Sequence, residues 1–201
     1  MATVSTYIDP IIEGGTIDNT PIGQTTPAAG AFTTLSGSAS VVIPDKTPVN
    51  AVASQGTITM AGIAIADETF VVGAQTFTWK AARGITGEVT IGADAPAAVT
   101  NIVIAITADL ATVTAVDGVG DTVVITAATK GVAGDAIILT ENSTNMTVDG
   151  TGTLGATIAG VDGTVGVADE IAQDASYLYV CLTTNTIADT NWRRVSVGAV
   201  Y

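Results

Sequence analysis

Residues that could perform chemistry are few in this chain, and their types exclude most catalytic mechanisms. The sequence contains no histidine and a single cysteine, Cys181. Without histidine there is no Ser-His-Asp or Cys-His catalysis, no His-ligated zinc and no histidine-based pH switch. A lone cysteine also excludes an intrachain disulfide and a cysteine-clustered metal site. Because Cys181 alternates within an apolar run, we interpret it as a buried structural thiol and not as a nucleophile.

Carboxylates are the remaining candidates, and five of them lie in Gly-rich turns: Asp117, Asp121, Asp135, Asp149 and Asp162. A calcium loop needs several closely spaced oxygen ligands and a bidentate acid at its end, and the first two of these acids are followed by no such Glu. Asp-Gly is a common hairpin dipeptide, so we interpret these acids as turn residues. Nothing in the sequence brackets two of them in a cleft, as a glycosidase would require. We therefore expect no catalytic, cofactor-binding or metal-binding residues, and a protein that is not an enzyme.

Composition and charge limit the partners. The 201 residues carry six Lys and Arg against 19 Asp and Glu, a formal net charge of −13. So few cations cannot supply the phosphate contacts of a nucleic-acid site, and they disfavour anionic membrane surfaces for the same reason. Charged residues make up only 12% of the chain, about half the usual share in soluble domains. This composition indicates surface hidden against partner chains, as in an obligate oligomer. No transmembrane helix and no secretory signal are expected.

The first segment, residues 1 to about 55, differs from the rest of the chain. It contains five of the six prolines and only one cation, Lys46. Each proline fixes φ and removes a backbone donor, which excludes long helices and central strands. Apolar residues recur along the segment without the density of a core, so it orders only by lying on another surface. We expect an extended attachment arm and linker; the alternative is a Pro-rich leader without fixed structure.

Residues 56–163 are expected to form a small module of a mainly β, α+β class. Two β-rich runs around a short Gly turn, Glu68–Val72 and Gln75–Lys80, predict a hairpin. A helix is predicted near 95–110, because Asp94 is a good N-cap and apolar residues follow it at alternating spacings of three and four. The order strand-strand-helix-strand-strand places the helix over one face of an antiparallel sheet.

Residues 164–201 are predicted to form a β meander. Its strongest strand is Tyr177–Leu182, and because both faces of this strand are apolar, we expect it to be buried on both sides. So short a segment cannot bury two faces alone, and it must pack on the module or on copies of itself. In the next strand Arg193 and Arg194 alternate. One of them pairs with an acid across a chain interface, or both lie at a solvated edge that deters unwanted strand pairing.

Two runs in the arm, Gly14–Gly23 (GGTIDNTPIG) and Thr26–Leu35 (TPAAGAFTTL), resemble a segment that recurs in tail-fibre, head-fibre and neck proteins of tailed bacteriophages. The module and the end of the chain, Tyr177–Cys181 followed by Asn191–Val195, also resemble parts of phage virion proteins. In that family the arm segment usually belongs to trimeric appendages attached to the virion. The resemblance implies attachment through six residues of the arm, which are Ile17, Pro21, Ile22, Pro27, Phe32 and Leu35.

The resemblance and the composition together predict a non-enzymatic structural protein of the virion, assembled in the host cytoplasm. We expect a homotrimeric head decoration, head-fibre or neck component. Its partners are its own copies and a capsid, portal, neck or tail protein, with no nucleic acid, no membrane and no cofactor. The candidates for the trimer interface are Tyr177, Tyr179, Trp192 and Arg194. The alternative is a tail-fibre protein or a receptor- or glycan-binding module, in which Tyr177, Tyr179, Trp192 and Tyr201 form a stacking surface.

Overall fold

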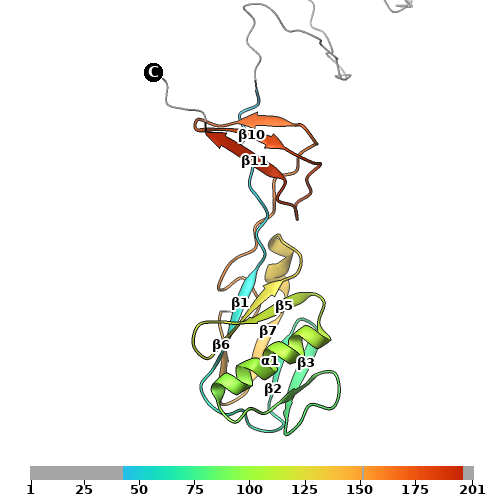
Figure 1. The fold of residues 1–201 in the computed structure, drawn as a ribbon, viewed down its shortest axis with the longest axis vertical. Coiled ribbons are helices and arrows are strands. Elements are labelled where there is room, and N and C mark those ends of the chain that lie inside the picture. Colours follow the sequence, from blue (N-terminus) through green and yellow to red (C-terminus); the bar gives the residue numbers. More distant parts are fainter. Residues whose placement is uncertain (1–42, 151, 197–201) are drawn as a thin grey trace, which may run out of the picture. The chain divides into compact units, whose positions relative to one another are not determined.

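Strands dominate the part of the chain that the computed structural model describes, residues 43–150 and 152–196. Within it, eleven strands form three sheets, and there is one α-helix (Figure 1). The β-rich α+β class predicted from the sequence is therefore confirmed. The six predicted attachment residues lie outside the described residues, and so does Tyr201: Ile17, Pro21, Ile22, Pro27, Phe32 and Leu35.

The strands of the first sheet of the module are rich in Thr and aliphatic residues, and alternate aliphatic side chains are buried on one face of the sheet. The sheet has four antiparallel strands in the spatial order β5 (Val113–Asp117), β6 (Thr122–Ala127), β1 (Gln55–Met60) and β8 (Met146–Val148). Along β6 the buried residues are Val123, Ile125 and Ala127, and the residues between them are half-buried. This alternation is typical of a sheet with one face on a core.

The second sheet contains the predicted hairpin. Its spatial order is β4 (Glu88–Thr90), β3 (Gln75–Lys80), β2 (Thr69–Val72) and β7 (Leu139–Asn142). β2 and β3 pair antiparallel around Gly73, which has φ +60. A turn with positive φ favours glycine because it has no Cβ. The rings of Phe70 and Phe77 stack with their centroids 5.1 Å apart, and the two strands thereby contribute aromatic side chains to the core.

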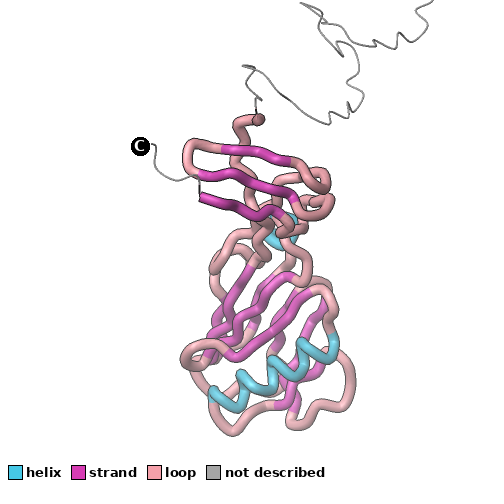
Figure 2. Tube along the Cα trace, turned by 45° about the horizontal axis from the view of Figure 1, so that its top comes forward, coloured by secondary structure: helices cyan, strands magenta, loops and turns pink. Residues whose placement is uncertain are grey.

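The helix α1 (Ala95–Asp109) begins where the sequence predicts. Asp94 accepts a hydrogen bond from the backbone nitrogen of Ala97 at 2.9 Å, as an N-cap should. At the other end, Asp109 pairs with Arg83 at 2.5 Å, which offsets a carboxylate at the negative end of the helix dipole. The helix contacts β1, β5 and β6 of the first sheet and β4 of the second, and it crosses their strands in Figure 2.

The single antiparallel sheet predicted for the module is wrong. The strands divide into two sheets that share one buried core with α1, and β4 joins β3 in parallel. The physical reason is coverage, because one helix of fifteen residues cannot cover the apolar faces of eight strands. A short 3-10 helix, η1 (Val132–Ala136), lies between β6 and β7.

The third sheet, here called the C-terminal sheet, consists of β9 (Ile171–Gln173), β10 (Tyr177–Cys181) and β11 (Trp192–Ser196). β10 lies in the centre and pairs antiparallel with both neighbours. One face buries a core of its own, separate from that of the module, formed by Ala172, Tyr179, Cys181 and Trp192. The predicted β-rich end of the chain is confirmed.

The prediction that Tyr177–Leu182 is buried on both sides is wrong within one chain. Tyr179 and Cys181 are buried, whereas Leu178 and Val180 are half-buried and Leu182 is exposed. The register places Val195 opposite Leu178, and Ile171 opposite Val180. We call the resulting apolar surface the outer face, formed by Ile171, Leu178, Val180 and Val195. Its two edge residues, Ile171 and Val195, are 46% and 64% exposed.

Two isoleucines on α1 allow a matched test of the helix packing. Ile102 is fully buried, whereas Ile104 is 55% exposed. Replacing Ile102 with Ala removes buried methyl groups and leaves a cavity, so we expect a loss of about 2–5 kcal/mol in the free energy of unfolding. Ile104→Ala is the control and should change it by less than about 1 kcal/mol. Urea denaturation of both variants measures the difference, and equal losses would show that this helix face is misplaced.

Candidate functional site

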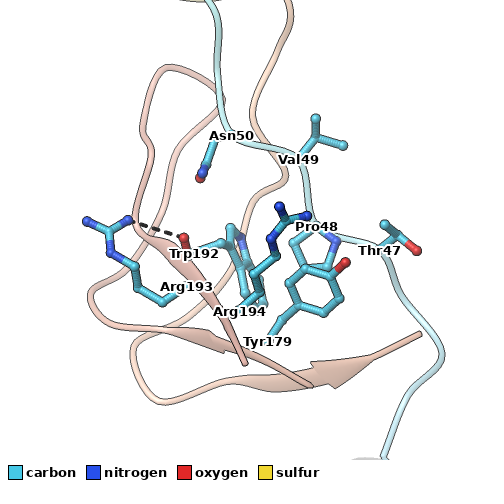
Figure 3. Close-up of a pocket in the computed structure, with 8 residues that line it drawn as sticks. All are labelled: Thr47, Pro48, Val49, Asn50, Tyr179, Trp192, Arg193 and Arg194. Carbon is cyan, nitrogen blue, oxygen red and sulfur yellow. Dashed lines mark hydrogen bonds between the residues drawn. The ribbon is translucent and has the colours of Figure 1, made fainter. Parts of the chain in front are cut away.

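A groove of about 550 Å³ lies between the C-terminal sheet and an extended segment that precedes the module. Figure 3 shows the residues that line it. One wall comes from residues 47–50, which are Thr47, Pro48, Val49 and Asn50, and the other comes from Tyr179, Trp192, Arg193 and Arg194.

Backbone hydrogen bonds hold the extended segment in place. Pro44 and Lys46 bond to both backbone groups of Gln173, with Gln173 N to Pro44 O at 3.1 Å and Lys46 N to Gln173 O at 2.8 Å. Asp45 and Gln173 thereby form an isolated parallel β-bridge at the edge of β9. Further along, Val49 N donates to Thr164 Oγ1 at 2.9 Å. Residues 44–51, which we call the arm root, are therefore joined to the C-terminal sheet and its flanking loop.

Lys46 fastens the arm root by its side chain. Its Nζ lies 2.8 Å from Glu170 Oε1, donates to Val165 O at 3.2 Å and sits 5.0 Å from the centroid of the Trp192 ring. The ammonium group lowers the pKa of Glu170 below its ordinary value, chiefly through this hydrogen bond. An ammonium over an indole face adds a cation–π attraction.

Trp192 forms the floor of the groove. Its indole nitrogen donates to Thr164 O at 2.8 Å, and the residue is only 3% exposed. Gly166 packs so closely on the indole ring that a Cβ at that position would overlap it. The glycine is required by this close approach, since no other residue leaves room for the ring.

Tyr179 and Asp174 form a polar contact beside this floor. The Tyr179 hydroxyl donates to Asp174 Oδ2 at 2.6 Å, while Asp174 Oδ1 accepts from the backbone nitrogens of Ser176 and Tyr177 at 2.7 and 2.8 Å. The hydroxyl, with these amides, lowers the pKa of Asp174 below its ordinary value. The same hydrogen bond raises the pKa of Tyr179 above its ordinary value.

The two arginines make the groove positive in an acidic chain. Arg194 reaches toward residues 47–50 (Figure 3). Its guanidinium lies 4.5 Å from the centroid of the Tyr177 ring. Arg193 points away from the centre and donates to Thr190 O at 2.8 Å. Within the described ranges neither arginine has a carboxylate within 4.0 Å, whereas three other cations each have one: Lys46, Lys80 and Arg83.

The structure brings the four predicted interface residues to one face of the C-terminal sheet. Tyr179, Trp192 and Arg194 line the groove, and Tyr177 stacks under Arg194. Tyr179 and Trp192 are 5% and 3% exposed and are covered by their own chain. These two covered rings offer no open face to a sugar, whereas Tyr177 is half-buried and Tyr201 lies outside the described residues, so the glycan-binding alternative stays a prediction. Their place in a trimer interface stays a prediction.

Sequence reasoning missed the wall formed by residues 47–50. We assigned them to the arm and its linker, because a segment rich in proline carries no periodicity that shows which surface it covers. Pro48 was the available signal, since an apolar, rigid residue in an extended segment lies well against an aromatic side chain. The arm root thus supplies half of the groove.

The acids singled out in the turns divide into two groups. Asp135, Asp149 and Asp162 accept hydrogen bonds from backbone amides, at 2.8 Å from Gly160, 2.6 Å from Thr57 and 2.9 Å from Val132. Asp117 and Asp121 have no side-chain hydrogen bond or ion pair among the described residues. The described part contains no group of three or more metal-ligating side chains, and no helix in it is long and apolar enough to cross a membrane.

The contact between Asp174 and Tyr179 predicts a measurable titration. Because the pKa of Asp174 is lowered in the folded chain, its bonds stabilise the fold above the ordinary pKa of an Asp, and this contribution is lost as pH falls through the lowered value. Tyr179→Phe removes the hydroxyl, so the Asp174 midpoint should rise toward the ordinary range in a ¹³C NMR titration. Tyr177→Phe is the control, since only the backbone of Tyr177 reaches Asp174. Equal midpoints in the wild type and Tyr179→Phe would contradict the contact.

Comparison of the chain with protein-family models, curated proteins and solved structures finds no match. The functional argument therefore depends on the residues of the groove, the arm root and the outer face.

Proposed function

We propose that this chain is a non-enzymatic structural protein of a tailed-phage virion, a homotrimer attached through its N-terminal arm. In this proposal the attachment residues are those that resemble the phage segment: Ile17, Pro21, Ile22, Pro27, Phe32 and Leu35. The body, residues 43–196, projects from the particle as a head decoration, head fibre or neck component. A tail-fibre position is the alternative site on the virion.

One observation carries the proposal: the arm root is built into a folded sheet. Lys46 contributes a backbone bond to Gln173, an ion pair to Glu170 and a contact with Trp192. The backbone nitrogens of Val49 and Ala51 donate to Thr164 Oγ1 and Asp189 O at 2.9 and 3.1 Å. An attachment arm has to be joined firmly to the body that it holds, whereas a free linker would not need these bonds. The bonds of residues 44–51 to the C-terminal sheet and its flanking loop form a firm junction of this kind.

The outer face supports the same proposal. It presents four aliphatic side chains on the sheet that holds the arm root, and its only charged neighbour in the strand register is Arg193, opposite Val180. A contiguous apolar surface of this kind is typical of a protein interface.

Three arms on one particle would bind far more tightly than one. Linked binding events raise the effective concentration of each following arm, so a weak single contact becomes tight when the geometry permits all three. The resemblance predicts a trimer, and the outer face leaves apolar surface exposed on the single chain. Both agree with a protein that functions as an oligomer.

Removal of residues 1–40 tests the proposal. The deletion leaves the arm root intact, so the body should keep its circular dichroism spectrum and melting temperature, while incorporation into phage particles should fall to background. Quantitative mass spectrometry of purified particles measures occupancy. Deletion of residues 1–8, which spares all six attachment residues, is the control. Normal occupancy of the longer deletion would refute attachment by the arm.

Sedimentation equilibrium of the full chain tests the oligomer separately. The expected mass is that of three chains of 20.0 kDa each. A monomer at every concentration would contradict the homotrimer, whatever the result with particles.

A further inference from the structure

The tip of the hairpin between β5 and β6 is the most exposed apolar point on the described surface. Val119 is 97% exposed there. The turn holds it firmly, since Gly118 N donates to Thr122 O at 2.9 Å and Thr122 Oγ1 donates to Val119 O at 3.0 Å. Gly120 completes the turn with φ +75. With almost all of its surface in water, this valine is available for contact with another molecule.

Two carboxylates flank this valine. Asp117 and Asp121 are exposed, and neither has a side-chain hydrogen bond or an ion pair in the described part of the chain. They differ in this from the other turn acids, each of which accepts a backbone hydrogen bond. We call residues 117–121 the acidic tip: one apolar side chain between two free negative charges.

The groove has the complementary chemistry. Pro48, Val49 and Trp192 give it an apolar lining, and Arg193 and Arg194 give it two positive charges without acidic partners among the described residues. Within one chain, no ion pair forms between these two arginines and the two aspartates of the acidic tip. Arginine binds carboxylates through paired donors, and a guanidinium already stacked on a tyrosine ring, as Arg194 is, needs little further ordering.

We propose that the acidic tip of one copy docks in the groove of a second copy. Val119 packs on the apolar lining, while Asp117 and Asp121 pair with Arg194 in the groove and Arg193 at its rim. The contact is heterologous, since tip and groove are different surfaces, and repeated contacts of this kind close into a ring when the rotation permits. This inference rests on the self-association in the proposed function and names the surfaces that produce it.

Charge reversal with rescue tests the inference on the full chain. Arg193→Glu with Arg194→Glu should weaken self-association by about tenfold or more in Kd, because two attractive pairs become repulsive. Asp117→Arg with Asp121→Arg should do the same. The quadruple variant restores opposite charges, so its Kd should return to within about threefold of the wild type. Sedimentation velocity at fixed salt measures all four proteins, and rescue excludes misfolding as the cause of the losses.

The apolar part of the contact has its own matched pair of variants. Val119→Asp should weaken self-association by about tenfold, because it removes the apolar contact and adds a third negative charge to the tip. Ile85→Asp is the control, since Ile85 is 70% exposed but lies in the loop before β4. It should leave Kd unchanged.

The outcomes separate this inference from the proposed function. If the chain forms trimers and the reversals do not change Kd, the docking of tip in groove is wrong and the trimer stands. If only the arginine reversal weakens association, the groove takes a different acidic partner and the tip is excluded. If the full chain is a monomer at every concentration, both the trimer and the docking are refuted, and attachment by the arm is decided by the deletion of residues 1–40.

Discussion

The contact between Lys46 and Trp192 joins the parts of the structure on which function depends. The C-terminal sheet has three short strands and a core of only four buried residues, too small to be stable without further cover. The arm root supplies that cover. Its lysine lies over the indole ring and pairs with Glu170. The groove, the junction with the arm and the stability of this sheet therefore depend on the same few side chains.

The order of the elements along the chain joins the module to the C-terminal sheet twice. The described chain begins at the C-terminal sheet, passes through the module and returns to end in β11. Two connecting segments therefore join the module to the sheet, paired where Val52 and Val161 exchange backbone bonds at 2.9 and 3.1 Å. Any force on the arm acts first on the sheet, and the module, with its larger core, carries the acidic tip without contributing to the junction.

Local signals in the sequence were sufficient for the helix and the hairpin but not for the faces of the strands. Asp94 and the spacing after it predicted α1, and the Gly turn predicted β2 and β3, because capping and turn chemistry act within a few residues. The parallel pairing of β4 with β3 depends on distant packing that no short pattern records. The segment Tyr177–Leu182 has apolar side chains on both faces, and periodicity alone cannot show which face is buried by the rest of the chain.

The acids of this chain explain how it can be both poor in charge and strongly negative. Hydrogen bonds from the side chains of Thr144 and Ser143 lower the pKa of Glu68. Backbone hydrogen bonds lower the pKa of Glu88, Asp135 and Asp189, so these acids act as fixed acceptors more than as partners of cations. Because hydrogen-bond donors satisfy these acids, the fold needs few cations to pair with them, and the formal net charge is −13. Two copies with this charge repel each other once their surfaces come within the screening length, about 8 Å at physiological ionic strength. In the proposed assembly, association therefore begins where the local charge is reversed, and Arg193 and Arg194 provide that reversal beside an apolar lining. A partner surface with free carboxylates around an apolar side chain fits it best, and the acidic tip has that composition.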